Sequence, residues 1–144
     1  MLSENNREYY RQHFFNAWHK HVKGHILEPW ESIVVDIIQK HPEYHHVLDD
    51  PGQFMNATFP EDNLNSNPFL HIGMHLALQE HIQLDRPAGF QKQYFTLLSK
   101  YKDPDWLEHK VMNIILNIIH ESVHQQRKPD ESKLLAALEK LGNK

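Results

Sequence analysis

Prolines that follow capping residues divide this chain into helices. Asn67-Pro68 and Asp103-Pro104 each place a helix-capping side chain directly before a proline, and Pro29 begins another segment with an apolar face. Proline fixes its φ angle and lacks an N–H, so it is tolerated in the first turn of a helix but not in the interior. Asn and Asp accept hydrogen bonds from the unpaired N–H groups of that turn. The pattern therefore predicts helices that begin at these prolines.

Between these breaks, apolar residues repeat at helical spacing, and there is no convincing set of alternating strands. We expect an all-α fold: a single compact, bundle-like domain over residues 1–144, with about five to six helices. The longer expected helices span residues 4–23, 29–41, 68–83, 90–100, 104–126 and 131–142, and a short one is expected at 42–48. Ser3 and Asp130 are further caps. An irregular loop is predicted at residues 49–66, with a brief extended piece at 54–59.

The composition excludes several kinds of partner and site. A formal net charge of −4 without a cluster of Lys and Arg predicts no binding to nucleic acid or to an anionic membrane. The N-terminus has no apolar signal core, and the longest apolar stretch, residues 111–119, is too short to span a bilayer, so we expect a cytoplasmic protein. Because cysteine is absent, disulfides and thiolate metal ligands are excluded. Any metal ion would be held by His, Glu, Asp, backbone carbonyls or water.

Histidine is the residue type that points to chemistry. The chain has 13 histidines in 144 residues, and four pairs of them are spaced four residues apart. These pairs are His21/His25, His41/His45, His71/His75 and His120/His124. Residues four apart share one face of a helix, where two imidazoles can bind the same metal ion. Since chance would place about one such pair in helical register, the excess makes metal binding the first functional hypothesis.

His71 and His75 are the best candidate ligands among these pairs. They lie in the first two turns of the helix predicted to begin at Pro68, on a face that also carries Met74 and Leu78. Burial of two imidazoles is costly unless each finds a partner, so the pair either bonds to backbone or acids, or ligates a metal ion. The positive end of the helix dipole disfavours a bare cation here, and carboxylates from other segments would have to offset it.

Glu108, His109 and His45 are the residues that we expect to complete a metal site. Glu108 and His109 stand near the start of the long helix predicted from residue 104. An acid in this position either complements the helix dipole or ligates a metal, and facing helices that carry His and Glu are how helical bundles build metal sites. Pro42 breaks the helical register between His41 and His45, so His41 could cap a short helix while His45 either faces inward or lies at the surface. These ligands suit zinc or iron, and the sequence does not choose between the two.

The segment HESVH (120–124) also fits the H-E-x-x-H pattern of zinc proteases, but we interpret this match as accidental. The pattern arises in about one of every eleven shuffled sequences of this composition, which is the false-positive risk of a short motif. A protease site needs a third ligand downstream, and apart from Asp130, which is expected to cap the last helix, only Glu131 and Glu139 are available. Arg127 and Lys128 follow the segment, which places it near the exposed end of its helix.

Four segments together carry a resemblance to a known family. They are HPEYH (41–45), NPFLHIGMHLALQE (67–80), DRPAG (85–89) and EHKVM (108–112). Over residues 9–140 the chain resembles the bacterial family of domains of unknown function numbered 1841. The resemblance implies no particular activity, but it places these candidate ligands inside the family's motifs: His45, His71, His75, Glu108 and His109. The family usually carries Gln at the position of His81 and an aromatic residue at that of His120, so HESVH lies outside its pattern.

These residues leave two functional hypotheses of different classes. In the first, the chain is a metal-binding helical protein; the sequence does not decide whether it is an enzyme, but the ligands would suit a metal-dependent hydrolase or a redox protein. In the second, it is a non-catalytic interaction or scaffold module whose buried histidines form a structural hydrogen-bonded network, with another protein or a second copy of the chain as partner. A metal site requires ligands from at least two helices to converge, whereas a scaffold shows each histidine bonded separately.

Overall fold

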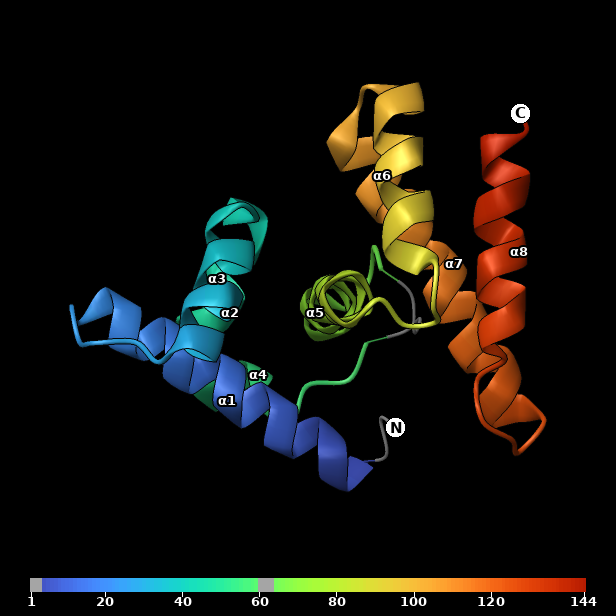
Figure 1. Cartoon of the computed structure of the whole chain (residues 1–144). Coiled ribbons are helices and arrows are strands. Elements are labelled where there is room, and N and C mark those ends of the chain that lie inside the picture. The colour runs from blue at the N-terminus through green and yellow to red at the C-terminus, as the bar shows by residue number, and fades with distance from the viewer. Residues whose placement is uncertain (1–3, 60–63) are drawn as a thin grey trace. The chain divides into compact units, whose positions relative to one another are not determined.

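The computed structural model describes residues 4–59 and 64–144, and within these ranges the protein consists of helices without a strand (Figure 1). The elements are α1 (Glu4–Val22), α2 (Pro29–Gln39), the 3-10 helix η1 (Pro42–Tyr44), α3 (His45–Leu48), α4 (Pro51–Phe54), α5 (Pro68–Leu84), α6 (Phe90–Tyr101), α7 (Pro104–His124) and α8 (Glu131–Gly142). The prediction of an all-α fold is confirmed. The described residues form more helices than predicted, because the segment 42–54 contains three helices of one turn each.

The region predicted to be one irregular loop contains the short helix α4. Asp50 caps this helix by accepting a hydrogen bond from the backbone N–H of Gln53 at 3.1 Å, and Pro51 occupies the first helical position. Residues 57–59 have no regular structure, so the extended piece expected at 54–59 is not a strand. The predicted cap at Ser3 and residues 60–63 of the predicted loop lie outside the described residues.

The chain divides into two compact units, of which the first is Met1–Gly73. In this unit α1 packs against α2 and α3, and α3 also contacts η1 and α4. The described core includes Phe14, Phe15, Trp18, Val34, Val35, Ile37, Ile38, Val47 and Leu48. The 3-10 helix that begins after His41 is held against α2, which fixes the position of that histidine.

The second unit, Met74–Lys144, is built on α6, α7 and α8, each of which packs against the other two (Figure 1). The described core of this unit includes Met74, Leu78, Phe90, Leu97, Leu107, Val111, Met112, Ile115, Leu134, Leu138 and Leu141. The phenol of Tyr101 donates a hydrogen bond to the backbone carbonyl of Leu141 at 2.7 Å, which ties the end of α6 to α8. Helix α7 packs against both α6 and α8, and Glu108 and His109 stand in its first two turns.

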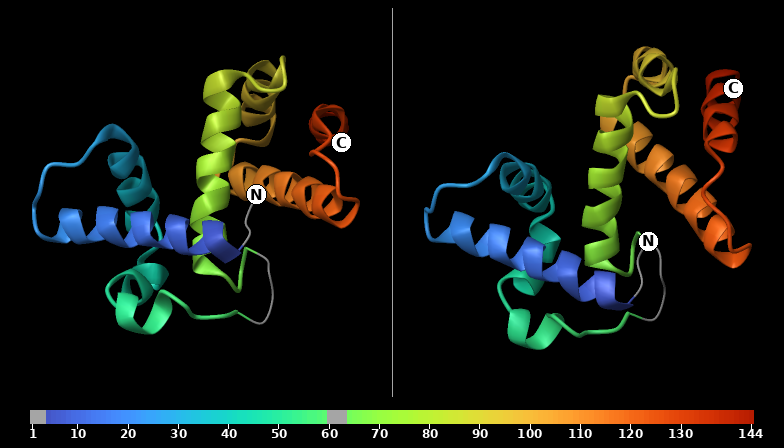
Figure 2. Two further views of the ribbon diagram at one scale, coloured as in Figure 1. Left: turned by 90° about the horizontal axis from the view of Figure 1, so that it is seen from below. Right: turned by 60° about the horizontal axis from the view of Figure 1, so that its bottom comes forward.

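Helix α5 is one uninterrupted helix, and the division between the units falls within it (Figure 2). Its start is the one predicted: the side-chain oxygen of Asn67 accepts hydrogen bonds from the backbone N–H groups of Phe69 and Leu70, at 3.1 and 3.2 Å. Pro68 follows the cap at the first helical position. The helix therefore places His71 in the first unit and His75, one turn later, in the second.

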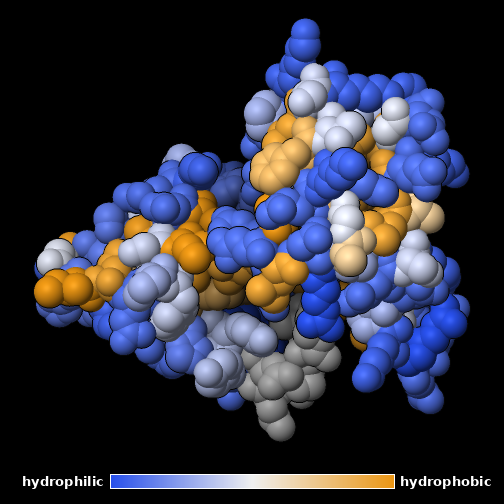
Figure 3. Space-filling view, viewed as in Figure 1, coloured by the Kyte–Doolittle hydropathy of each residue, from blue (hydrophilic) through white to orange (hydrophobic). Residues whose placement is uncertain are grey.

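The described helices include none that combines the length and the apolar character needed to cross a bilayer. Some large apolar side chains are nevertheless exposed in the first unit, and Ile26, in the connection between α1 and α2, is 95% exposed. Figure 3 shows apolar surface at this end of α1 and α2, at the left of the view.

Candidate metal site

The candidate site is built on the first two turns of α5. His71 and His75 are buried there, with 6% and 5% of their surfaces exposed. Their neighbours in the helix, Ile72, Met74 and Leu78, are buried as well. A buried imidazole needs a hydrogen-bond partner, and the structure supplies one for the Nδ1 atom of each histidine.

The hydrogen-bond partner of His71 Nδ1 lies in the first unit. Its Nδ1–H donates to the backbone carbonyl of Leu64 at 3.0 Å, and because a carbonyl oxygen can only accept, the proton of a neutral His71 is on Nδ1. The His71 ring meets the ring of His41 edge-on, with a centroid distance of 4.5 Å and an interplanar angle of 70°. Tyr44 approaches the same His71 ring at 5.5 Å.

His41 is the N-cap residue of η1, but its side chain makes no capping hydrogen bond. Its Nδ1 lies 3.3 Å from the Oε2 atom of Glu43, and its ring stacks on Tyr44 at 5.3 Å. Burial, together with the negative charge of Glu43, raises the pKa of Tyr44 to about 12. The ring that stacks on His41 is therefore a neutral phenol at physiological pH.

The hydrogen-bond partner of His75 Nδ1 lies in the second unit, on α7. Its Nδ1–H donates to the Oε1 atom of Glu108 at 2.6 Å. Its ring meets the ring of His109 edge-on, with a centroid distance of 5.0 Å and an interplanar angle of 90°. Burial, with the charge of Glu108 as a second cause, raises the pKa of Tyr94 to about 12. Glu108 thus contacts the buried imidazole of His75, and its charge also acts on the buried, neutral phenol of Tyr94.

His109 is oriented by its own helix. Its Nδ1–H donates to the backbone carbonyl of Asp105 at 2.8 Å, one turn earlier in α7, and the Asp105 carboxylate lies 3.6 Å from the same nitrogen. Asp103 caps this helix by accepting a hydrogen bond from Trp106 N–H at 3.0 Å. The cap and the first turn of α7 thereby set the direction of the His109 ring.

Neighbouring histidines bring their ring nitrogens close enough to share an ion. In the first unit, a ligating nitrogen of His41 lies within 4.8 Å of one of His71; the same limit holds for His75 and His109 in the second unit, and for His71 and His75 along α5. His41, His71, His75 and His109 are therefore a group of histidines that could hold a metal ion. Two of them are buried and two are partly buried.

Three of the residues selected from the sequence, His71, His75 and His109, belong to this group. Glu108 is not a member, but it contacts one through its hydrogen bond with His75. His45 is not a member either: its Nε2–H donates to the backbone carbonyl of Ile38 at 2.9 Å, and its ring lies 4.7 Å from that of Trp18.

His41 is the member of the group that the sequence reasoning did not select. The signal that could have found it is its place at the start of the HPEYH segment, whose last residue, His45, was selected instead. Its proximity to His71 arises from tertiary packing between η1 and α5, and no spacing in the sequence encodes it.

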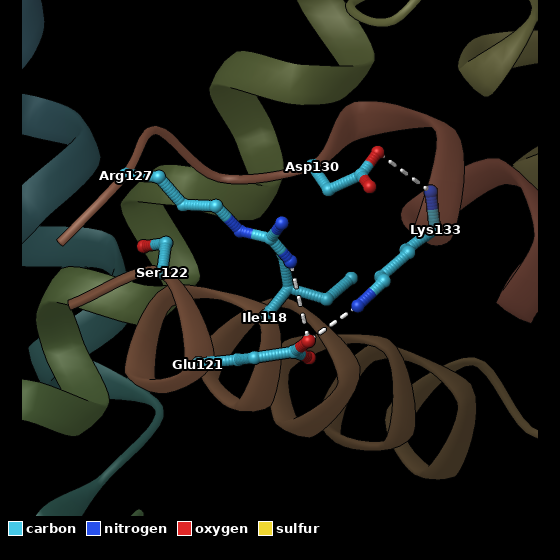
Figure 4. A pocket seen from close by; sticks show the side chains of 6 residues that line it. All are labelled: Ile118, Glu121, Ser122, Arg127, Asp130 and Lys133. Carbon is cyan, nitrogen blue, oxygen red and sulfur yellow. Dashed lines mark hydrogen bonds and ion pairs between the residues drawn. The ribbon is translucent and has the colours of Figure 1, made fainter. Parts of the chain in front are cut away.

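The HESVH segment has different surroundings, and Figure 4 shows those of two of its residues, Glu121 and Ser122. His120 and His124 are exposed at the end of α7. Glu121 accepts a hydrogen bond from Lys133 and lies 3.5 Å from a guanidinium nitrogen of Arg127. The bond with Lys133, followed by the charges of Lys133 and Arg127, holds the pKa of Glu121 below its ordinary value. The carboxylate is thus engaged in ion pairs, and the metal-ligand group found among the described residues does not include this segment.

The comparison with protein families gives a match over most of the chain. The model of the family named Domain of unknown function (DUF1841) matches residues 6–140 of the 144. The chain belongs to this family. In this DUF1841 protein the matched segment contains all four histidines of the group. No curated protein and no solved structure gave a match.

Proposed function

We propose that this protein binds one transition-metal ion through His41, His71, His75 and His109. The observation that carries the proposal is that neighbouring histidines of this group bring their ligating nitrogens within 4.8 Å of one another. In addition, each Nδ1 atom faces an oxygen atom that can accept its proton in a hydrogen bond. When Nδ1 carries the proton, the lone pair of a neutral imidazole is on Nε2, and that atom is the metal ligand.

Oxygen acceptors behind the ring are the usual outer partners of metal-bound histidines, because they fix the tautomer and the orientation of the ring. Two of the acceptors here are backbone carbonyls, those of Leu64 and Asp105, and two are the carboxylates of Glu43 and Glu108. The ligands and acceptors come from η1, α5 and α7 and from the residues that flank them. This origin meets the requirement that ligands come from more than one helix.

The ligand set favours zinc or iron over magnesium and calcium, which prefer oxygen ligands. Four imidazoles complete the tetrahedral coordination of zinc, so a zinc ion would have no position open to water and its role would be to stabilise the fold. Iron accepts additional ligands, and the same four residues would leave it open positions for redox or hydrolytic chemistry. We propose zinc as the resident ion, with iron as the alternative to be tested in parallel.

One observation favours the second function, a scaffold with structural histidines. Each Nδ1 atom has its own oxygen acceptor within the protein, as expected of histidines that serve only to satisfy buried polar groups. This arrangement accounts for each ring separately. It does not require that the rings meet in neighbouring pairs, which is why we rank metal binding first.

The test is the metal content of the untagged full-length protein, measured by elemental mass spectrometry. The variant His71→Ala/His75→Ala removes two proposed ligands from α5, and His109→Ala removes one that is partly exposed. The matched control is His120→Ala/His124→Ala, which removes a pair of the same spacing from exposed positions of α7. Circular dichroism of each variant checks that its helices are retained.

We expect about one zinc or iron ion per chain in the wild type and in the control, and a loss of that ion in both ligand variants. An absence of metal from the wild type after incubation with Zn²⁺ and with Fe²⁺ would overturn the proposal in favour of the scaffold. Equal metal content in the wild type and in folded ligand variants would overturn the assigned residues.

A further inference from the structure

Among the acceptors behind the four histidines, Glu108 differs from the other three. Its Oε1 atom lies 2.6 Å from Nδ1 of His75, which is the length of a strong, charge-assisted hydrogen bond. The two backbone carbonyls carry no net charge. The other carboxylate, Glu43, lies farther from its histidine, at 3.3 Å, and its side chain is 59% exposed, against 33% for Glu108.

We propose that Glu108 acts on the metal ion through His75, as a positioning residue, and that it is not itself a ligand; this inference rests on the proposed function. The carboxylate holds the Nδ1 proton of His75 and so directs the lone pair of Nε2 toward the ion. A negative charge in this position also makes the imidazole a stronger donor.

The charge balance of the ligand set supports this role. Four neutral imidazoles leave the two positive charges of a divalent ion uncompensated, and removal of such an ion from water is costly without negative charge nearby. Glu108 supplies one negative charge in a half-buried position, in contact with a ring of the group.

The placement of Glu108 on α7 fits the same role. Glu108 and His109 are consecutive residues, so their side chains leave the helix in directions about 100° apart. His75 meets both of them, His109 ring to ring and Glu108 through its own Nδ1. One turn of α7 therefore supplies a ligand and, beside it, the carboxylate that orients a second ligand.

The experiment uses Co²⁺ as a spectroscopic substitute for zinc, followed by competition with Zn²⁺, in the full chain. Glu108→Gln keeps the size and an acceptor oxygen but removes the charge, and Glu108→Ala removes both. Glu43→Gln is the matched control, and His109→Ala shows the spectrum of a site that has lost a ligand. The thermal midpoint of each metal-free variant reports effects on the fold alone.

We expect Glu108→Gln to weaken Co²⁺ and Zn²⁺ binding about 10-fold and Glu108→Ala about 10- to 100-fold, the range for outer partners of metal ligands. The visible Co²⁺ bands at saturation should keep the wild-type positions and intensity, because the number of ligands is unchanged, and Glu43→Gln should have a smaller effect on affinity. Unchanged affinity in Glu108→Gln would overturn the inference and leave the proposed function intact. Bands that change as they do in His109→Ala would show Glu108 to be a ligand. A wild type that binds neither ion would refute the proposed function itself.

Discussion

Arg11 brings a positive charge into the interior of the first unit, where only 1% of it is exposed. Its Nη1 atom donates to the backbone carbonyls of Phe54, Met55 and Ala57 at 3.3, 3.0 and 2.8 Å, and its guanidinium carbon lies 4.4 Å from the centre of the Phe69 ring. These contacts connect α1 to the end of α4, to the residues that follow it and to the start of α5. Burial, and secondarily the charge of Arg7, lowers the pKa of Arg11, which is the sign of a desolvated cation.

We expect Arg11→Met to lower the free energy of unfolding by about 2 kcal/mol, because three carbonyls lose their donor. The loss is kept moderate because Nε and Nη2 of Arg11 are buried without a hydrogen-bond partner, so part of the charge's desolvation is uncompensated in the wild type. Urea unfolding at pH 7 measures the difference. Arg11→Lys, which keeps the charge with fewer donors, should lie between the two, and a methionine variant as stable as the wild type would contradict the assigned role.

Glu31 gives the stability of the protein a dependence on pH. Its carboxylate is buried, with 2% of the residue exposed, and accepts hydrogen bonds from Glu28 N–H at 2.8 Å and from Lys20 Nζ at 3.1 Å. The bond from the Glu28 backbone, and then that from Lys20, lowers the pKa of Glu31 below its ordinary value of 4.5. A carboxyl group with a lowered pKa in the folded state stabilises the fold above its unfolded pKa, and this contribution is lost as the pH falls through the folded value.

We therefore expect Glu31→Gln to unfold at a lower temperature than the wild type at pH 7. The gap should narrow as the pH falls below 4.5, because the wild-type carboxyl group then takes up its proton. Thermal unfolding followed by circular dichroism between pH 7 and pH 3 measures this gap. A gap that does not change over this range would mean that the ionised carboxylate of Glu31 contributes nothing to the stability of the fold.

At the scale of the helices, the cap of α5 should support both the fold and the metal site. Replacement of Asn67 by Ala leaves two N–H groups of the first turn without their side-chain acceptor, which costs about 1 kcal/mol. His71 lies in that turn, so we also expect weaker zinc binding. The control is Asp130→Ala, which removes a cap from α8, where Asp130 accepts from Ser132 N–H and Lys133 N–H. Asp130→Ala should lower the stability by a similar amount and leave the zinc affinity unchanged. Equal zinc affinity in the two variants would mean that the Asn67 cap does not support the metal site.

The starts of the long helices could be predicted from the sequence because their signals are local. Asn67-Pro68 and Asp103-Pro104 begin α5 and α7 as expected, and Asp130 caps α8. The one-turn helix α4 was not predicted, since a helix of this length has little stability of its own and depends on contacts with the rest of its unit. Trp30 and Trp106 lie in helices with apolar faces but are 40% and 44% exposed, because a pattern gives the face of a helix but not the neighbour that covers it.

The same distinction applies to the candidate site. The pairing of His71 with His75 depends only on spacing within one helix, and their place in the first turns of α5 follows from the cap. The contact of His71 with His41, and that of His75 with Glu108, join residues 30 and 33 positions apart, so they depend on packing that no local pattern records. Glu108 was selected from the sequence as a ligand because residue type and position suggested it; its contact with an imidazole nitrogen is visible only in the structure.

At the scale of the whole molecule, the proposed ion should appear as a gain in stability. A ligand that binds only the folded state adds RT ln(1 + [L]/Kd), which is about 2.7 kcal/mol when free zinc is at one hundred times its Kd. For a chain of 144 residues this corresponds to a rise of roughly 5–10 °C in the unfolding midpoint. The measurement is thermal unfolding of the metal-free protein with increasing Zn²⁺, and reversal of the shift by a chelator.

Two variants show which histidines cause this shift. His109→Ala should lose most of the shift, whereas His120→Ala/His124→Ala should keep all of it, because His120 and His124 lie outside the group. A shift of equal size in all three proteins would mean that zinc acts at exposed histidines, and the four-histidine site would then have no part in the stability of the fold.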